Sequence, residues 1–126
     1  MKNNILLLLI FFIVAIINSS CESKKEILMY GAKSCDSSDV RYTGPITNII
    51  NANCNSCHAT GVANSLGGGV ALDNYAGLSF WAANGVLFDN VSEASGANPM
   101  PKNAPKLSDC DIAKIRIWIN NGYPNN

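Results

Sequence analysis

Two cysteines and the single histidine of the chain form the group of residues best suited to chemistry. They stand in the pentapeptide Cys54-Asn55-Ser56-Cys57-His58, in a chain of 126 residues with five cysteines. On a helical turn, residues three apart project from the same side, so both sulfur atoms can add to the two vinyl groups on one edge of a porphyrin. The imidazole of the next residue can then turn to the iron. The spacing therefore predicts one covalently attached haem c, with Cys54 and Cys57 as thioether attachments and His58 as an iron ligand.

Two other uses of the cysteine pair are open. Cys54 and Cys57 could bind zinc together with two of the remaining cysteines, but structural zinc sites usually come as paired C-x-x-C motifs. They could also form a redox-active disulfide, which is typical of a β-α-β context that this sequence does not indicate. Haem attachment is the better interpretation because its motif also uses the histidine.

The iron of such a haem needs a second ligand or an open position, and methionine is the residue type to consider. The chain has three methionines, at positions 1, 29 and 100. Met1 falls in the expected leader, and Met29 falls in the tether that is expected to follow it. Met100 stands between Pro99 and Pro101, which hold the backbone extended. We expect Met100 to be the second iron ligand; the alternative is that it fills a gap in the core and the iron is five-coordinate or bound by another group.

The first 20 residues have the pattern of a secretion signal. Lys2 is followed by an unbroken apolar run over residues 5–17, which as a helix would reach about 20 Å, short of a bilayer core of about 30 Å. Ser19-Ser20-Cys21 resembles a bacterial lipobox, whose cysteine is diacylated after cleavage. We expect a signal peptide over residues 1–20, lipid on Cys21 and a tether over residues 21–34. The alternative is ordinary cleavage nearby, which would leave Cys21 free.

Two cysteines, Cys35 and Cys110, remain once the others are assigned. In the oxidising compartment to which a secretion signal leads, we expect them to form a disulfide bond. This bond would join the N-terminal segment to the start of the last helix. The alternative is a pair of free thiols.

Helical patterns indicate the elements that position these residues. We expect a helix over residues 45–53, with Ile46, Ile49 and Ile50 on one apolar face that leads into Cys54. A second is expected over residues 73–83, capped by Asp73 or Asn74 and with its aromatic residues in the core, and a third over residues 86–93. The last begins at the capping box of Ser108 to Asp111 and ends at Gly122.

The segments between these helices are expected to be loops. Residues 60–70 show no period, and their glycine triplet lacks the flanking residues of a phosphate-binding loop. Residues 98–105 contain three prolines. No alternating pattern predicts a strand. The fold class is therefore predicted as all-α, with about four helices wrapped around the haem in one domain over residues 35–126.

The charge balance argues against one class of partner. Nine Lys and Arg residues balance nine Asp and Glu residues, so no basic surface for nucleic acid is expected. We expect a monomer.

The region from about residue 43 to 123 resembles the single-haem, class I-like c-type cytochromes, and in particular the planctomycete-type cytochrome c domain. The resemblance rests on five ordered blocks: Pro45-Ile46, Asn53 through His58, Gly68 through Tyr75, Met100-Pro101 with Lys106-Leu107-Ser108, and Asp111-Ile112 through Ile115, Trp118-Ile119 and Gly122. It implies Cys54 and Cys57 as haem attachments and His58 and Met100 as iron ligands. It also implies that the first and last helices cross behind the haem, near Trp118.

These expectations describe an electron carrier rather than an enzyme. A haem with histidine and methionine ligands has no open position for a substrate, so it exchanges single electrons through the porphyrin edge. We expect respiratory donor or acceptor proteins as partners, and a location on the periplasmic side or at the cell surface, anchored to a membrane by lipid on Cys21. The alternatives are an open-iron haem protein that senses a small ligand or reduces peroxide, and a haem subunit of a larger complex.

Overall fold

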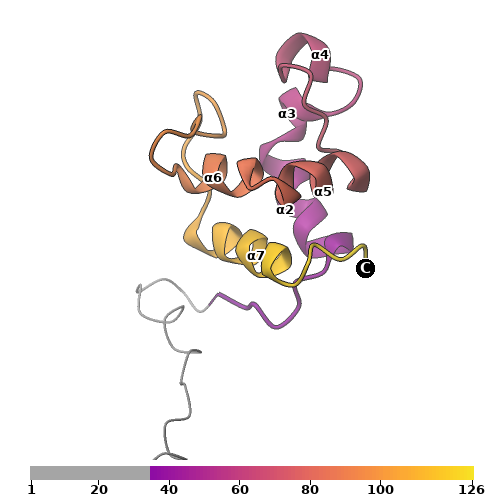
Figure 1. Cartoon of the computed structure of the whole chain (residues 1–126), viewed down its shortest axis with the longest axis vertical. Helices are drawn as coiled ribbons and strands as arrows, with labels where there is room; N and C mark the ends of the chain where they lie inside the picture. The colour runs from indigo at the N-terminus through magenta and orange to yellow at the C-terminus, as the bar shows by residue number, and fades with distance from the viewer. Residues whose placement is uncertain (1–34) are drawn as a thin grey trace, which may run out of the picture. The chain divides into compact units, whose positions relative to one another are not determined.

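Six α-helices and one π-helical turn make up the regular structure of residues 35–126, the part of the chain that the computed structural model describes; no strand occurs among them (Figure 1). The elements, in chain order, are η2 (Tyr42–Ile46), α2 (Thr47–Asn53), α3 (Asn55–His58), α4 (Ala63–Leu66), α5 (Tyr75–Ala83), α6 (Val86–Ser92) and α7 (Asp109–Asn120). The predicted all-α class is confirmed for this range. The signal peptide, the lipid on Cys21 and the tether are predictions that fall outside the described residues, as does Met29.

The four longer helices lie where the sequence predicts helices, with one shifted start. The first was expected from Pro45, but α2 begins at Thr47. The preceding residues form η2, in which Gly44 has a φ of 97°, a conformation that favours glycine and interrupts a helix. Thr47 fixes this turn, because its Oγ1 accepts a hydrogen bond from the Gly44 N–H and donates one to the Gly44 carbonyl.

The caps of α5 and α7 agree with the sequence pattern. Of the two candidates at the start of α5, Asn74 is the cap, and its side chain accepts a hydrogen bond from the N–H of Gly77 at 2.9 Å. At the start of α7, Ser108 Oγ accepts from the Asp111 N–H at 3.1 Å. The chain leaves α7 through Gly122, which has a φ of 83°. Local side-chain and glycine signals therefore define both helices.

One helix lies where a loop was expected. Residues 63–66 of the glycine-rich segment form α4, a single turn that the N–H groups of Leu66 and Gly67 close by donating to Val62 and Ala63. A four-residue helix shows no apolar period, so the sequence pattern carries no sign of it. Another expectation was also wrong: the Phe80 side chain, expected in the core, is 62% exposed.

The core is formed mainly by buried side chains on one face of each of the four longer helices. Its largest members with almost no exposed surface are Trp118, Ile46, Ile50, Leu78 and Ile115. The predicted apolar face of the first helix is therefore buried, and so is the face of α7 that carries Ile112, Ile115 and Trp118.

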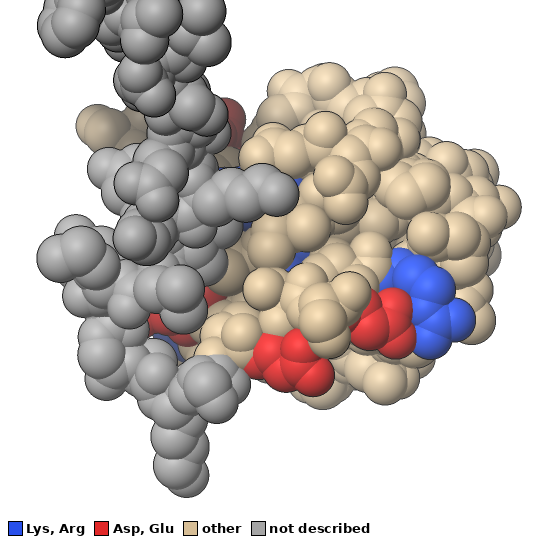
Figure 2. Space-filling view, turned by 90° about the horizontal axis from the view of Figure 1, so that it is seen from below, with Lys and Arg blue, Asp and Glu red and all other residues tan. Residues whose placement is uncertain are grey.

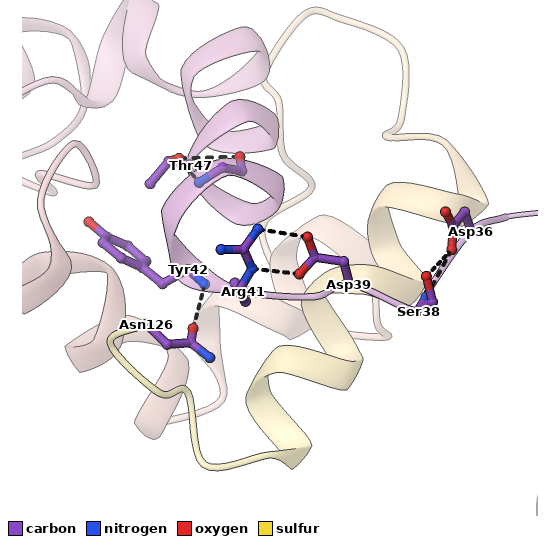
Figure 3. A network of polar contacts seen from close by, with 8 residues as sticks. Asp36, Ser38, Asp39, Arg41, Tyr42, Thr47 and Asn126 are labelled. Atoms are coloured by element: carbon purple, nitrogen blue, oxygen red, sulfur yellow. Dashed lines mark hydrogen bonds and ion pairs between the residues drawn. The ribbon is translucent and has the colours of Figure 1, made fainter.

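The last helix, α7, packs against an early and a late element of the chain. It contacts α6 and η2, and Trp118 stacks on Tyr42 with ring centroids 6.1 Å apart. The resemblance implies a crossing of the first and last helices near Trp118; in the structure, η2, which leads into the first helix, makes this contact. The C-terminal Asn126 lies beside the same segment, where its Oδ1 accepts a hydrogen bond from the Tyr42 N–H (Figure 3).

A disulfide bond joins Cys35 to Cys110, the pair expected from the sequence. It holds the segment before η2 to the first turn of α7. Within that segment Arg41 forms a bidentate ion pair with Asp39. Asp36 accepts hydrogen bonds from Ser38 (Figure 3). No helix within residues 35–126 combines the length and the apolar character needed to cross a membrane.

Candidate functional site

The cysteine pair lies on a single helical turn at the junction of α2 and α3. Cys54 ends α2 with a φ of −121° and a ψ of −39°, which separates the two helices. Its carbonyl accepts hydrogen bonds from the N–H groups of Cys57, at 3.1 Å, and His58, at 2.9 Å. The pentapeptide therefore closes on itself, and residues three apart on such a turn project from the same side. Both thiols are free.

The two thiols differ in their surroundings. Cys54 packs against the hydrophobic core, whereas Cys57 is exposed. Burial raises the pKa of the Cys54 thiol to about 11, so it stays protonated near neutral pH. A protonated thiol is a poor redox nucleophile. The environment of Cys54 therefore disfavours the redox-active disulfide.

Zinc is disfavoured by the placement of the remaining ligands. Cys35 and Cys110 are joined to each other in the disulfide bond. Among residues 35–126, no three His, Cys, Asp or Glu side chains come together in a group that could hold a metal ion. Cys54, Cys57 and His58 thus have no protein neighbour in this range to complete a tetrahedral site.

His58 is held in one orientation by the backbone of a later segment. Its Nδ1 lies 2.9 Å from the carbonyl oxygen of Val70. A carbonyl oxygen can only accept a hydrogen bond, so Nδ1 carries the proton. The neutral ring then has its free lone pair on Nε2, at the far side of the imidazole. A histidine that binds a metal through one nitrogen generally donates from the other in this way.

The loop that carries Val70 is tied back at two further points to the predicted haem-binding turn, residues 54–58, and to the residues just after it. The Leu72 N–H donates to the carbonyl of His58 at 2.7 Å. Asp73 accepts two hydrogen bonds from Thr60, one from its N–H at 2.8 Å and one from its hydroxyl at 2.7 Å. These bonds hold the pKa of Asp73 below the ordinary 3.8. The loop therefore closes on itself from residue 60 to residue 73 and presents Val70 to His58.

Met100 lies on a separate segment, the loop that follows α6. It is half-buried, and its N–H donates to the carbonyl of Asn90 at 3.1 Å. The side-chain oxygen of Asn90 accepts a second hydrogen bond, from the Asn98 N–H at 3.1 Å. In Figure 1 this loop and the α3–α4 segment rise on the same side of α5 and α6. The structure thus places Cys54, Cys57 and His58 on one turn and Met100 on another segment, which Asn90 fixes to α6.

A surface hollow of about 310 Å³ lies next to this loop. Its lining consists of residues of α6 and of residues 94–98, with Asp89 as the one charged member. Neither the cysteine pair nor His58 takes part in it. The hollow is therefore not the predicted haem site.

Sequence reasoning missed the groups that orient His58 and the loop of Met100. Val70 acts through its backbone carbonyl, which no side-chain pattern reveals. Asn90 and Asp73 are polar residues at helix and loop positions where such residues are common. Only the glycine triplet of residues 67–69 gave a signal, because three consecutive glycines indicate tight turns or close approach of chain segments.

Comparisons of the chain with protein-family models, with curated proteins and with solved structures found no match.

Proposed function

We propose that this chain carries one covalently attached haem c and serves as an electron carrier, with His58 and Met100 as the residues that would bind the iron. One observation carries the proposal. The two free thiols lie on a single turn directly before a histidine whose Nδ1 is hydrogen-bonded to Val70, so that Nε2 offers its lone pair. This donor set fits a haem better than zinc, which lacks further ligands in the described range.

Each of these residues has a distinct role in the proposal. Cys54 and Cys57 would hold the porphyrin through two thioether bonds, each formed by addition of an S–H group across a vinyl group, at the junction of α2 and α3. His58 keeps its proton on Nδ1 and donates a hydrogen bond from there to the Val70 carbonyl, which increases the basicity of Nε2. Met100 offers a thioether from a loop that Asn90 and the flanking prolines hold in place. When bound, the haem supplies one-electron redox chemistry, and a methionine ligand raises its reduction potential.

The few charges of the described residues would steer a redox partner toward the protein only weakly. Residues 42–72, which include the haem-binding turn, contain no Lys, Arg, Asp or Glu. In the face shown in Figure 2 the charged side chains are few, and acidic and basic groups lie side by side. Residues 35–126 carry seven acidic and five basic side chains, a net charge of −2. Encounter with redox partners would then depend little on ionic strength.

The N-terminal sequence supports a location for this activity. A signal peptide over residues 1–20 and lipid on Cys21 would place the carrier outside the cytoplasm and hold it at a membrane. The Cys35–Cys110 disulfide bond supports export, since such bonds persist in oxidising compartments. Cys21→Ser should move the protein from the membrane fraction to the soluble fraction; unchanged membrane association would contradict lipid anchoring.

Covalent attachment is tested directly by mass spectrometry. The chain is produced in a host with a cytochrome c maturation system and measured after denaturation. We expect the mass of one haem to stay with the wild-type chain and to be absent from the Cys54→Ala/Cys57→Ala variant. Cys35→Ala/Cys110→Ala is the matched control, because it also removes two cysteines but should retain the haem. A wild-type chain without haem would contradict the proposal.

A further inference from the structure

The glycine-rich segment approaches the haem-binding turn more closely than any side chain allows. Gly67, directly after α4, is buried. A Cβ atom at this position would lie 2.5 Å from the carbonyl oxygen of Cys57 and 2.8 Å from Nδ1 of His58, distances that real Cβ atoms do not show. The first of these atoms belongs to the backbone. The second belongs to the ring of the expected iron ligand.

Space, and not backbone conformation, is the reason for glycine here. Gly67 has a φ of −101° and a ψ of 11°, which other residues also adopt. The next residue is the opposite case: Gly68 has a φ of 62°, and a Cβ there would meet no atom within 4 Å. Gly61 has neither constraint, since a Cβ would again meet nothing and its φ is ordinary. The same segment therefore offers one glycine needed for space, one needed for conformation and one needed for neither.

The position of Gly67 is coupled to the hydrogen bond that orients His58. The Gly67 N–H donates to the carbonyl of Ala63 at 2.9 Å, and the Gly67 carbonyl accepts from the Val70 N–H at 3.1 Å. The Val70 carbonyl in turn accepts from His58 Nδ1. Gly67 thus leaves no room for a side chain beside Nδ1 of His58, and it also hydrogen-bonds to the residue whose carbonyl accepts the hydrogen bond from that nitrogen. A methyl group at residue 67 would push against the ring at the atom that makes this bond.

We propose that Gly67 is a positioning residue for His58. Its missing side chain lets the imidazole take the orientation in which Nδ1–H bonds to Val70 and Nε2 stands free on the other side of the ring. The redox consequence of this role rests on the proposed haem function. The ring orientation and its hydrogen bond belong to the polypeptide and can be measured with or without haem.

The experiment compares three glycine variants of the full chain produced with the maturation system. Gly67→Ala adds the methyl group beside His58, Gly61→Ala adds it in open space, and Gly68→Ala adds backbone strain alone. Solvent exchange of the His58 Nδ1 proton is followed by NMR in the reduced protein, and the reduction potential is measured by titration. Urea unfolding of each variant reports stability separately.

We expect the Nδ1 proton of the wild-type protein to exchange slowly, and Gly67→Ala to speed its exchange about tenfold, the factor that corresponds to the loss of one hydrogen bond. The reduction potential of Gly67→Ala should shift as well. Gly61→Ala should match the wild type in every measurement. Gly68→Ala should be less stable but keep the wild-type exchange rate and potential.

Several results would overturn the inference. Unchanged proton exchange and potential in Gly67→Ala would contradict it, and global unfolding of this variant would assign Gly67 to general packing. A rapidly exchanging Nδ1 proton in the wild type would also contradict it. If the wild-type chain carries no haem, the proposed function fails. The exchange comparison between the folded wild type and Gly67→Ala then still decides whether Gly67 positions the ring.

Discussion

Removal of the Cys35–Cys110 disulfide bond should cost this chain a large part of its stability. The bond closes a loop of 75 residues. For a loop of this length the chain-entropy model gives about 4.5 kcal/mol at 25 °C, because the bond restricts the unfolded chain. Domains of this size are stabilised by about 5–15 kcal/mol in total. The variant without the bond should therefore lose roughly a third or more of this stability.

The assay is urea unfolding, followed by circular dichroism, of the wild type and the Cys35→Ala/Cys110→Ala variant. With a slope of about 2 kcal/mol per molar urea, the midpoint should fall by about 2 M. Each single substitution should lose a similar amount, since either one breaks the bond. Ser37→Ala controls for a side-chain change in the same segment and should have little effect. A loss below about 1 kcal/mol in the double variant would refute the reasoning.

Three further predictions concern other parts of the molecule. Asn90→Ala, which frees the loop of Met100, should lower stability by about 1 kcal/mol. In the proposed haem form, this variant should let added imidazole displace Met100 from the iron at lower concentration; an unchanged imidazole titration would contradict this role. Because Thr60 lowers the pKa of Asp73 below 3.8, the charged carboxylate stabilises the fold above that pH and the contribution is lost as the pH falls through the lowered pKa. The stability difference between wild type and Asp73→Asn should accordingly be larger at about pH 6 than at about pH 2, and an equal difference at both would be evidence against it. Trp118→Ala, at a side chain with no exposed surface, should cost about 3–5 kcal/mol in urea unfolding, and a cost below about 1 kcal/mol would show that the core repacks around the gap.

The helices that carry their own signals were predictable from the sequence. Ser108 and Asp111 lie three residues apart and hydrogen-bond each other, so α7 could be located without knowledge of the rest of the fold. Asn74 is a comparable signal for α5. The start of α2 was placed two residues early because Pro45 suits a first helical turn, whereas the φ of Gly44 delays the helix. Two hydrogen bonds between Thr47 Oγ1 and the Gly44 backbone fix that conformation, and a threonine at this position does not announce them in the sequence.

The candidate site, like the helices, was predictable only where its residues are neighbours in the sequence. Cys54, Cys57 and His58 are neighbours in the sequence, so their common turn follows from local geometry. The hydrogen bond from His58 to Val70 spans 12 residues and involves a carbonyl, and the contact of Gly67 involves an absent side chain. Contacts of this kind carry no side-chain pattern in the sequence, so they can be identified only from the folded structure. The meeting of Met100 with a haem held by His58 stays a prediction.

The central claim, a haem with His58 and Met100 as iron ligands, is tested most directly by absorption spectroscopy. Reduced-minus-oxidised spectra of the wild type are compared with those of Met100→Ala and, as a matched control, Met29→Ala. We predict a low-spin spectrum in the wild type and in Met29→Ala. Met100→Ala should lose the low-spin spectrum, with the haem still attached after denaturation. A Met100→Ala spectrum identical to the wild type would contradict the ligand assignment and favour a haem protein with an open or different distal position.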